Sequence, residues 1–212
     1  MPDESLWESF FRPAEVLRLL QLAPACRDVV EFGCGYGTFT IPAAKIVPGS
    51  IVAFDIEPKM ITGTQARASQ AGIGNVLPVL RDFATNGTGL PSASMGYAML
   101  FNILHAEAPQ VLLAEAYRVL APEGIVGIMH WNHDPSTPRG PSMDIRPKPE
   151  QCIAWAQQAG FELLPPGIVE LPPYHYGMAL TRPAHAEDTT RSTCAALRKG
   201  GPRNVGSGQF DS

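Results

Sequence analysis

The chain alternates between short apolar runs and longer stretches in which apolar residues recur every three or four positions. Short runs rich in β-branched residues predict strands, and the longer periodic stretches predict helices. The predicted strands are 27–32, 50–56, 75–80, 97–104, 125–130, 161–164, 168–171 and 174–181. The predicted helices are 38–47, 58–71, 108–120 and 149–159. This alternation predicts an α/β fold of the doubly wound type, with helices on both faces of a parallel sheet.

Proline and glycine mark the ends of several elements. Pro58 falls in the first helical turn, where its missing N–H costs nothing, and residues 121–124 end the helix before them. Residues 132–149 form a Pro- and Ser-rich loop, long enough to suggest a functional role. The periodicity stops near residue 183, so we expect one domain over 1–182 and a disordered tail over 183–212.

Composition and charge exclude several classes. The 212 residues include 16 basic and 20 acidic side chains, with no Lys/Arg block, which disfavours nucleic-acid and membrane-surface binding. No apolar run approaches the roughly 18 residues that span a bilayer. The first residues lack the features of a secretory signal. The four cysteines contain no C-x-x-C pair, so we expect reduced thiols and a cytoplasmic protein.

The most informative segment is the loop after the first predicted strand. Residues 31–37 read E-x-G-x-G-x-G. A glycine cluster between strand and helix lets backbone N–H groups approach a ligand closely. A dinucleotide-binding loop requires Gly or Ala where this chain has Thr38, so that pattern fails.

This loop resembles motif I of the class I S-adenosylmethionine (SAM) dependent methyltransferases. Four further segments resemble the family in the same order, namely 51–58, 81–83, 101–105 and 115–124. Together they extend the resemblance over roughly 25–181, and their wording is similar to the ubiquinone/menaquinone-biosynthesis type. The resemblance implies a seven-stranded, mostly parallel Rossmann-like sheet with an antiparallel last strand. It also implies SAM as the cofactor and S-adenosylhomocysteine as its product.

The resemblance assigns roles to individual side chains. Asp55, twenty residues after Gly35, would accept both ribose hydroxyls. Ile56 would pack on the adenine, Asp82 and the Phe83 N–H would bind its polar edge, and Asn102 would line the methionine end. The full expected cofactor set is Glu31, Gly33, Cys34, Gly35, Gly37, Asp55, Ile56, Asp82, Phe83 and Asn102.

Four of these residues have structural alternatives. Asp55 and Asp82 could be ordinary loop acids. Glu31 could face the cofactor ammonium or hold the loop backbone. Cys34 is interpreted as a small filler of the turn.

Methyl transfer from a sulfonium needs little catalytic apparatus. The leaving group departs neutral, so the protein mainly positions the acceptor about 3 Å from the methyl and excludes water. A base serves only to deprotonate the acceptor. His105 and His130, near the ends of strands four and five, are candidates, with packing as the alternative. His130, His133 and Asp134 do not make a convincing metal site, so we expect none.

Acceptor specificity in this family comes from added segments, here 6–13 and 132–149. Both are short, which predicts a small-molecule acceptor, with no nucleic acid or membrane partner, and a monomer or homodimer. Trp7, Phe10 and Phe11 would form a lid over the cofactor or, alternatively, part of a helix packed on the sheet edge. Residues 171–174 imitate an N/D-P-P-Y box, but begin with Leu and lie near the C-terminus, which disfavours base amino-methylation.

Two other functions remain in competition with a methyltransferase. A non-catalytic SAM-binding regulatory protein would keep the same fold without turnover. A nicotinamide-dependent oxidoreductase shares the acid some twenty residues after the loop but fails at Thr38.

Overall fold

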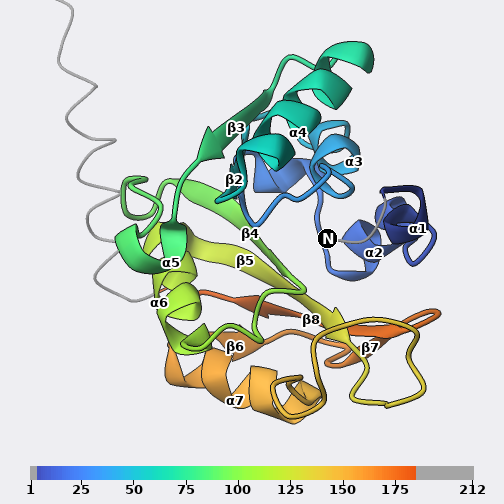
Figure 1. Ribbon diagram of the computed structural model, residues 1–212. Helices are drawn as coiled ribbons and strands as arrows, with labels where there is room; N and C mark the ends of the chain where they lie inside the picture. The colour runs from blue at the N-terminus through green and yellow to red at the C-terminus, as the bar shows by residue number, and fades with distance from the viewer. Residues whose placement is uncertain (1–3, 185–212) are drawn as a thin grey trace, which may run out of the picture.

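A single sheet organises the chain, of which the computed structural model describes residues 4–184 (Figure 1). The predicted tail, apart from residues 183 and 184, therefore lies outside the described residues. The strands are β1 Val29–Phe32, β2 Ile51–Asp55, β3 Val76–Leu80, β4 Met95–Phe101, β5 Leu120–Trp131, β6 Glu162–Leu163, β7 Val169–Leu171 and β8 His175–Thr181. The helices are α1 Glu4–Glu8, α2 Pro13–Leu19, α3 Thr40–Ala44, α4 Pro58–Gln70, α5 Phe83–Asn86, α6 Pro109–Val119 and α7 Pro149–Gln158, with a short 3-10 turn at Pro24–Cys26.

The strand order is β3-β2-β1-β4-β5-β8-β6, and β7 pairs with β8. Strands β1 to β5 run parallel, whereas β8 is antiparallel to β5, β6 and β7. The order reverses between β1 and β4, and ligands of open α/β sheets bind beside the carboxyl ends of strands at such a reversal. The fold thus directs attention to the loops that follow β1, β2 and β4.

Helices cover both faces of the sheet. One hydrophobic core contains residues of α2, α3 and α4, and the second contains residues of α5, α6 and α7 (Figure 1). Every residue of β1 and β2 is buried. Strands covered on both faces read as continuous apolar runs, which is why these two were visible in the sequence.

The structure confirms the doubly wound α/β fold but corrects its details. The sheet has eight strands where seven were expected. The last strand, β8, is antiparallel to each of its neighbours, as expected. The fourth strand ends at Phe101 and not at residue 104, because Asn102 adopts a left-handed φ of 54°. The fifth begins at Leu120, so residues 121–124 belong to a strand with a register shift. The short helices α2 and α5 were not predicted.

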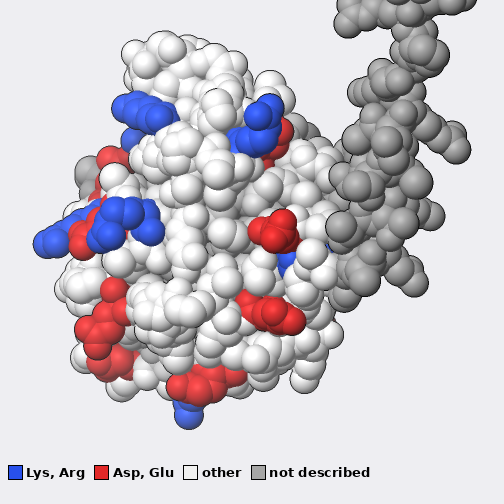
Figure 2. Space-filling model, turned by 180° about the vertical axis from the view of Figure 1, so that it is seen from behind, with Lys and Arg blue, Asp and Glu red and all other residues white. Residues whose placement is uncertain are grey.

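No helix among residues 4–184 is long and apolar enough to cross a membrane. On the face shown in Figure 2, Lys and Arg side chains lie beside Asp and Glu side chains and do not form a continuous basic stripe.

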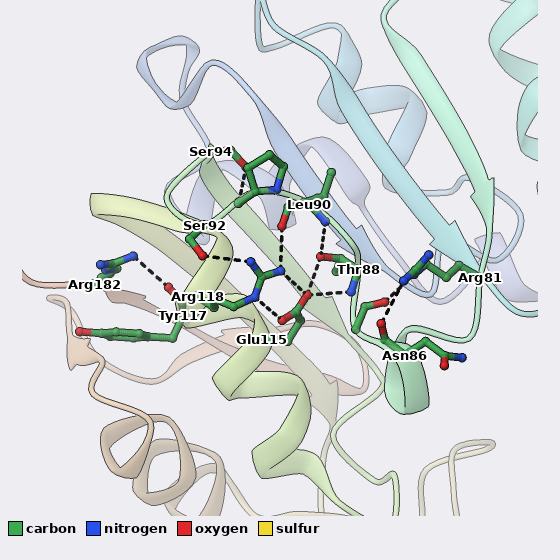
Figure 3. Close-up of polar contacts among 12 residues, drawn as sticks. Arg81, Asn86, Thr88, Leu90, Ser92, Ser94, Glu115, Tyr117, Arg118 and Arg182 are labelled. Carbon is green, nitrogen blue, oxygen red and sulfur yellow. Dashed lines mark hydrogen bonds and ion pairs between the residues drawn. The ribbon is translucent and has the colours of Figure 1, made fainter.

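The segment that leads into β4 is fastened by an ion pair of α6 (Figure 3). Glu115 accepts hydrogen bonds from the backbone N–H and the hydroxyl of Thr88, at 2.7 and 2.6 Å. Arg118 pairs with Glu115 at 2.7 Å and also donates to the Leu90 carbonyl and the Ser92 hydroxyl. The E-x-x-R part of the family motif therefore has a structural role here. The bonds from Arg118, aided by those from Thr88, lower the pKa of Glu115 to about 2.

Replacing Glu115 by alanine should lower the free energy of unfolding by about 2 kcal/mol, because the Thr88 N–H and Arg118 lose their acceptor. A lowered carboxyl pKa stabilises the folded state above the unfolded pKa near 4.5, and this contribution is lost as pH falls toward about 2. The free energies of unfolding of wild type and Glu115→Ala, measured by urea denaturation, should therefore converge as the pH falls from 4.5 to about 2. The exposed Glu170→Gln variant is the control, and equal stability of all three proteins at pH 7 would contradict the assignment.

Candidate functional site

A cavity of about 200 Å³ opens where β1, β2 and β4 end, and we call it the glycine-loop cavity. Six of the ten expected cofactor residues line it, namely Glu31, Gly33, Cys34, Gly35, Asp55 and Asn102. Sequence reasoning gave no cofactor role to the further lining residues Thr38, Phe39, Glu57, Met60, Phe101 and Ile103. The fold therefore brings most of the predicted site to one place.

The turn after β1 needs glycine for two physical reasons. Gly33 and Gly37 have φ of 82° and 76°, in the left-handed region that other residues rarely adopt. A Cβ would also come within 3.2 Å of Ile103 at Gly33 and 3.1 Å of Thr64 at Gly37. Gly37 thus shapes the turn from outside the cavity lining.

Asp55 ties the end of β2 to the glycine loop. One carboxylate oxygen accepts the Gly35 N–H at 2.9 Å, and the other accepts the Glu57 N–H at 3.0 Å. Each oxygen of an ionised carboxylate has a second lone pair. The side chain can therefore hold the loop and still accept two hydroxyl groups of a ligand.

Glu31 is a buried acid at the floor of the cavity. Its carboxylate accepts the Thr40 hydroxyl, so it also holds the start of α3. Burial, reinforced by the nearby charge of Asp55, raises its pKa to about 8 despite the opposing hydrogen bond. A cation bound beside Glu31 would favour its ionised form.

Two buried polar atoms of the cavity wall have no partner among the described residues. They are the Thr38 hydroxyl oxygen and the Asn102 amide oxygen. Buried polar groups are nearly always hydrogen-bonded, so these two point to a ligand. SAM carries a carboxylate that a hydroxyl can bind and an ammonium that an amide oxygen can bind. Together with the free lone pairs of Asp55, the residues present fit this cofactor.

The remaining expected residues lie beyond the cavity. Ile56 is 59% exposed, and Asp82 is exposed and caps α5 by accepting the Thr85 N–H at 3.0 Å. That bond lowers the pKa of Asp82. The Phe83 ring is buried beside Phe32, so only its backbone remains for a ligand. Because ligand pockets usually measure roughly 300–1,000 Å³, SAM would have to extend past the cavity toward Ile56 and Asp82.

A second cavity of about 540 Å³, here called the outer cavity, shares Trp7 and Asn102 with the first. It continues to His105, Trp131 and Arg139. A third cavity of about 490 Å³ adjoins it at His105. A ligand in the glycine-loop cavity would therefore have a second space beside it, on the side of β4 and β5, in which another molecule could bind.

The two candidate histidines contact each other. His105 Nδ1 lies 3.2 Å from His130 Nε2, and His130 is completely buried. Burial lowers the pKa of His130 to about 3 and also lowers that of His105. His133 lies apart, since its Nδ1 donates to the Arg146 carbonyl at 2.7 Å. Among residues 4–184 no three His, Cys, Asp or Glu side chains gather as a metal site.

The N-terminal aromatic residues combine the two arrangements considered for them. Phe10 and Phe11 follow α1 and are buried, with their ring centroids 5.4 and 6.5 Å from that of Trp131, so these two side chains pack in the core. Trp7, in contrast, borders both the glycine-loop and outer cavities. Glu8 pairs with Arg67, whose guanidinium also donates to the Tyr36 carbonyl in the glycine loop.

A buried arginine, which the sequence did not single out, orders the loop after β5. Arg146 is 6% exposed and donates to main-chain carbonyls across the loop. Its acceptors are the carbonyls of Asn132, Asp134, Arg139 and Pro141 and the hydroxyl of Thr137. One side chain thereby folds the loop that closes the outer cavity.

The thiols and the proline box take no visible part in the site chemistry. Cys34 is buried, and burial raises the pKa of its thiol, which agrees with a packing role. Cys26 and Cys152 are also free thiols, and Cys194 lies outside the described residues. Leu171 ends β7, and residues 172–174 form the turn into β8, so this segment does not close β4 as an N/D-P-P-Y box would.

Comparison with known proteins supports the same assignment. Residues 29–124 match the family described as "Methyltransferase domain". Nocamycin O-methyltransferase of Saccharothrix syringae is 33% identical over 123 residues, which are 56% of this chain and 43% of that protein. This chain thus spans less than half the length of that relative.

Solved structures share the fold at lower identity. A SAM-dependent methyltransferase from Aquifex aeolicus superposes with a TM-score of 0.74 and 22% identity, over 85% of this chain and 94% of that one. The [4+2]-cyclase SpnF superposes with a TM-score of 0.69 and 16% identity, over 81% of each chain. Residues 29–124 thus match a methyltransferase domain, and the chain as a whole shares the fold of SAM-dependent methyltransferases.

Proposed function

We propose that the chain binds SAM in the glycine-loop cavity and transfers its methyl group to a small molecule in the outer cavity. The observation that carries this proposal is the meeting of Asp55, with lone pairs to spare, and two unpartnered polar atoms on one cavity wall. SAM supplies an electrophilic methyl group on a sulfonium that leaves as a neutral thioether. The protein therefore needs to bind, orient and exclude water.

Each residue has a proposed task. Asp55 accepts the two ribose hydroxyls, and Asn102 and Thr38 bind the amino-acid end. Ile56 and Asp82 flank the adenine beyond the cavity, where Ile56 offers exposed apolar surface and Asp82 keeps one oxygen outside its capping bond. Glu31 supplies negative charge on the cationic side of the ligand.

Several features favour a small acceptor that is methylated on an oxygen atom. The outer cavity measures about 540 Å³, within the range of small-ligand pockets. Indole rings of Trp7 and Trp131 border it, which suits a planar or apolar molecule. The relative from Saccharothrix syringae is named an O-methyltransferase.

A second candidate is a SAM-binding protein that does not transfer the methyl group. The fold relative SpnF, described as a [4+2]-cyclase, shows that this architecture also occurs in proteins named for another reaction. Binding of S-adenosylhomocysteine without its release from SAM in the presence of any small-molecule acceptor would favour this candidate.

Asp55→Asn should weaken S-adenosylhomocysteine binding about 10- to 100-fold, the effect of losing charge-assisted hydrogen bonds. Calorimetry measures the affinity, and S-adenosylhomocysteine release from SAM over a panel of small metabolites measures turnover. Asp134→Asn, an exposed carboxylate of the loop after β5, is the matched control and should bind normally. Equal affinity of the Asp55 variant and wild type would refute the proposed site.

SAM binding should release a proton and strengthen as pH rises from about 6 to about 8. Glu31 has a pKa near 8 in the free protein, so it is protonated at pH 7, and a bound cation draws out its ionised form. Calorimetry in buffers of different ionisation enthalpy measures the released proton. The number of protons released by Glu31→Gln is subtracted from the number released by wild type. This difference removes the contribution of the ligand's own α-amino group. A difference of zero at pH 7 would exclude this role.

Trp7→Ala should raise the dissociation constant for S-adenosylhomocysteine about tenfold, because it removes an indole that borders the glycine-loop cavity. Leu6→Ala alters the exposed neighbour on the same helix and should leave the affinity unchanged. Fluorescence or calorimetric titration tests both. If the two variants bind alike, α1 serves packing alone.

A further inference from the structure

Two histidine rings meet at the border of the outer cavity. His105 follows β4 in the chain and His130 lies in β5, the neighbouring strand. Their nitrogens, Nδ1 of His105 and Nε2 of His130, are 3.2 Å apart, and the rings are inclined by 74°. In such a contact one nitrogen must carry a proton and the other must accept it.

The surroundings of His130 decide which nitrogen donates. His130 is completely buried, and burial lowers its pKa to about 3, so the ring is neutral with a single N–H. Its Nδ1 faces the Trp131 carbonyl at 3.5 Å, and a carbonyl can only accept. The proton is therefore on Nδ1, and Nε2 of His130 is an acceptor.

The tautomer of His130 determines the tautomer of His105. Since His130 Nε2 accepts, His105 Nδ1 must carry the proton, and the neutral His105 ring has a bare Nε2. This nitrogen makes no hydrogen bond to a described residue. His105 borders the outer cavity together with Asn102, which also borders the glycine-loop cavity.

We propose that His105 is the general base that deprotonates a hydroxyl acceptor, and that His130 is the positioning residue that keeps Nε2 of His105 free of a proton. The inference rests on the proposed methyl transfer and deepens it by naming the acceptor class. That class is a neutral O–H compound that must lose its proton to react.

The step balances without a further reactant. The acceptor O–H proton passes to Nε2 of His105, and the oxygen electron pair forms a bond to the methyl carbon. The carbon–sulfur bond breaks as this bond forms, and its electron pair stays on sulfur. The products are a methyl ether, S-adenosylhomocysteine and an imidazolium, which returns its proton to solvent.

Several charged or titratable groups contact His105 or line the two cavities that it borders. They are His130 from β5, His133, Arg139, Asp144 and Arg146 from the loop after β5, Glu107 from the connection to α6, and Lys148 before α7. Burial lowers the pKa of His105 below its usual 6.5, so the ring is in its base form at neutral pH. The rate should therefore rise with pH and level off below pH 7.

The first test needs no acceptor. Long-range ¹H–¹⁵N correlation spectra of the full chain with S-adenosylhomocysteine at pH 7 report each histidine tautomer, and His105→Gln assigns the signals. We expect both His105 and His130 to carry their proton on Nδ1. A proton on Nε2 of His105, or a doubly protonated ring at pH 7, would overturn the proposal.

The second test measures S-adenosylhomocysteine release from SAM with a panel of phenols and enols of graded acidity. His105→Gln should slow the weakly acidic members about 10²- to 10⁴-fold, spare those ionised at the assay pH, and abolish the pH inflection. His133→Gln should retain that inflection. His130→Gln, whose amide oxygen can still accept, should keep more activity than His130→Leu.

The outcomes separate the two proposals. Loss of S-adenosylhomocysteine binding by the wild-type chain contradicts the proposed function itself. Normal binding with no turnover of any hydroxyl compound, or equal slowing of ionised and neutral acceptors in His105→Gln, contradicts only the inference about His105.

Discussion

The rest of the site depends on one carboxylate that joins two strand ends. Asp55 accepts one backbone N–H from the glycine loop and one from its own strand end, which fixes the loop after β1 against the end of β2. The left-handed glycines allow this approach, because a side chain at Gly33 would crowd Ile103. The same carboxylate keeps lone pairs that point to a diol. In the proposed function, one residue therefore serves both loop geometry and ligand recognition.

Around Asp55 the fold places a buried acid and two buried polar oxygens without partners. Glu31 is buried, and burial raises its pKa to about 8, while Thr38 and Asn102 have buried oxygens that no described residue satisfies. A cavity with these properties is arranged for a ligand with positive charge and hydrogen-bonding ends. On the far side of Asn102, two indoles and a histidine border a separate space. The inner cavity sets its acids and unpartnered oxygens among apolar side chains, and the proposed function places the donor there and the acceptor in the outer cavity.

Local pattern was enough to predict much of the fold. Strands β1 and β2 are buried on both faces, so their continuous apolar runs could be identified as strands. Helices α4 and α6 begin and end within two residues of their predicted limits. The pattern failed where backbone conformation overrides propensity. Asn102 turns the chain with a positive φ and ends β4 early, and β5 absorbs a segment with proline and glycine that reads as a turn. Likewise, six of ten expected cofactor residues share a cavity because they lie in one motif or at strand ends. Arg146 and the His105–His130 contact were out of reach, since they depend on loop packing and on strand pairing that no local pattern encodes.

A crystal structure of the chain with S-adenosylhomocysteine tests the central claim most directly. The account predicts both ribose hydroxyls within hydrogen-bonding distance of Asp55, the adenine beyond it at Ile56, and the sulfur facing the outer cavity beside Asn102. A nucleoside bound elsewhere, or a ribose turned away from the Asp55 carboxylate, would contradict it.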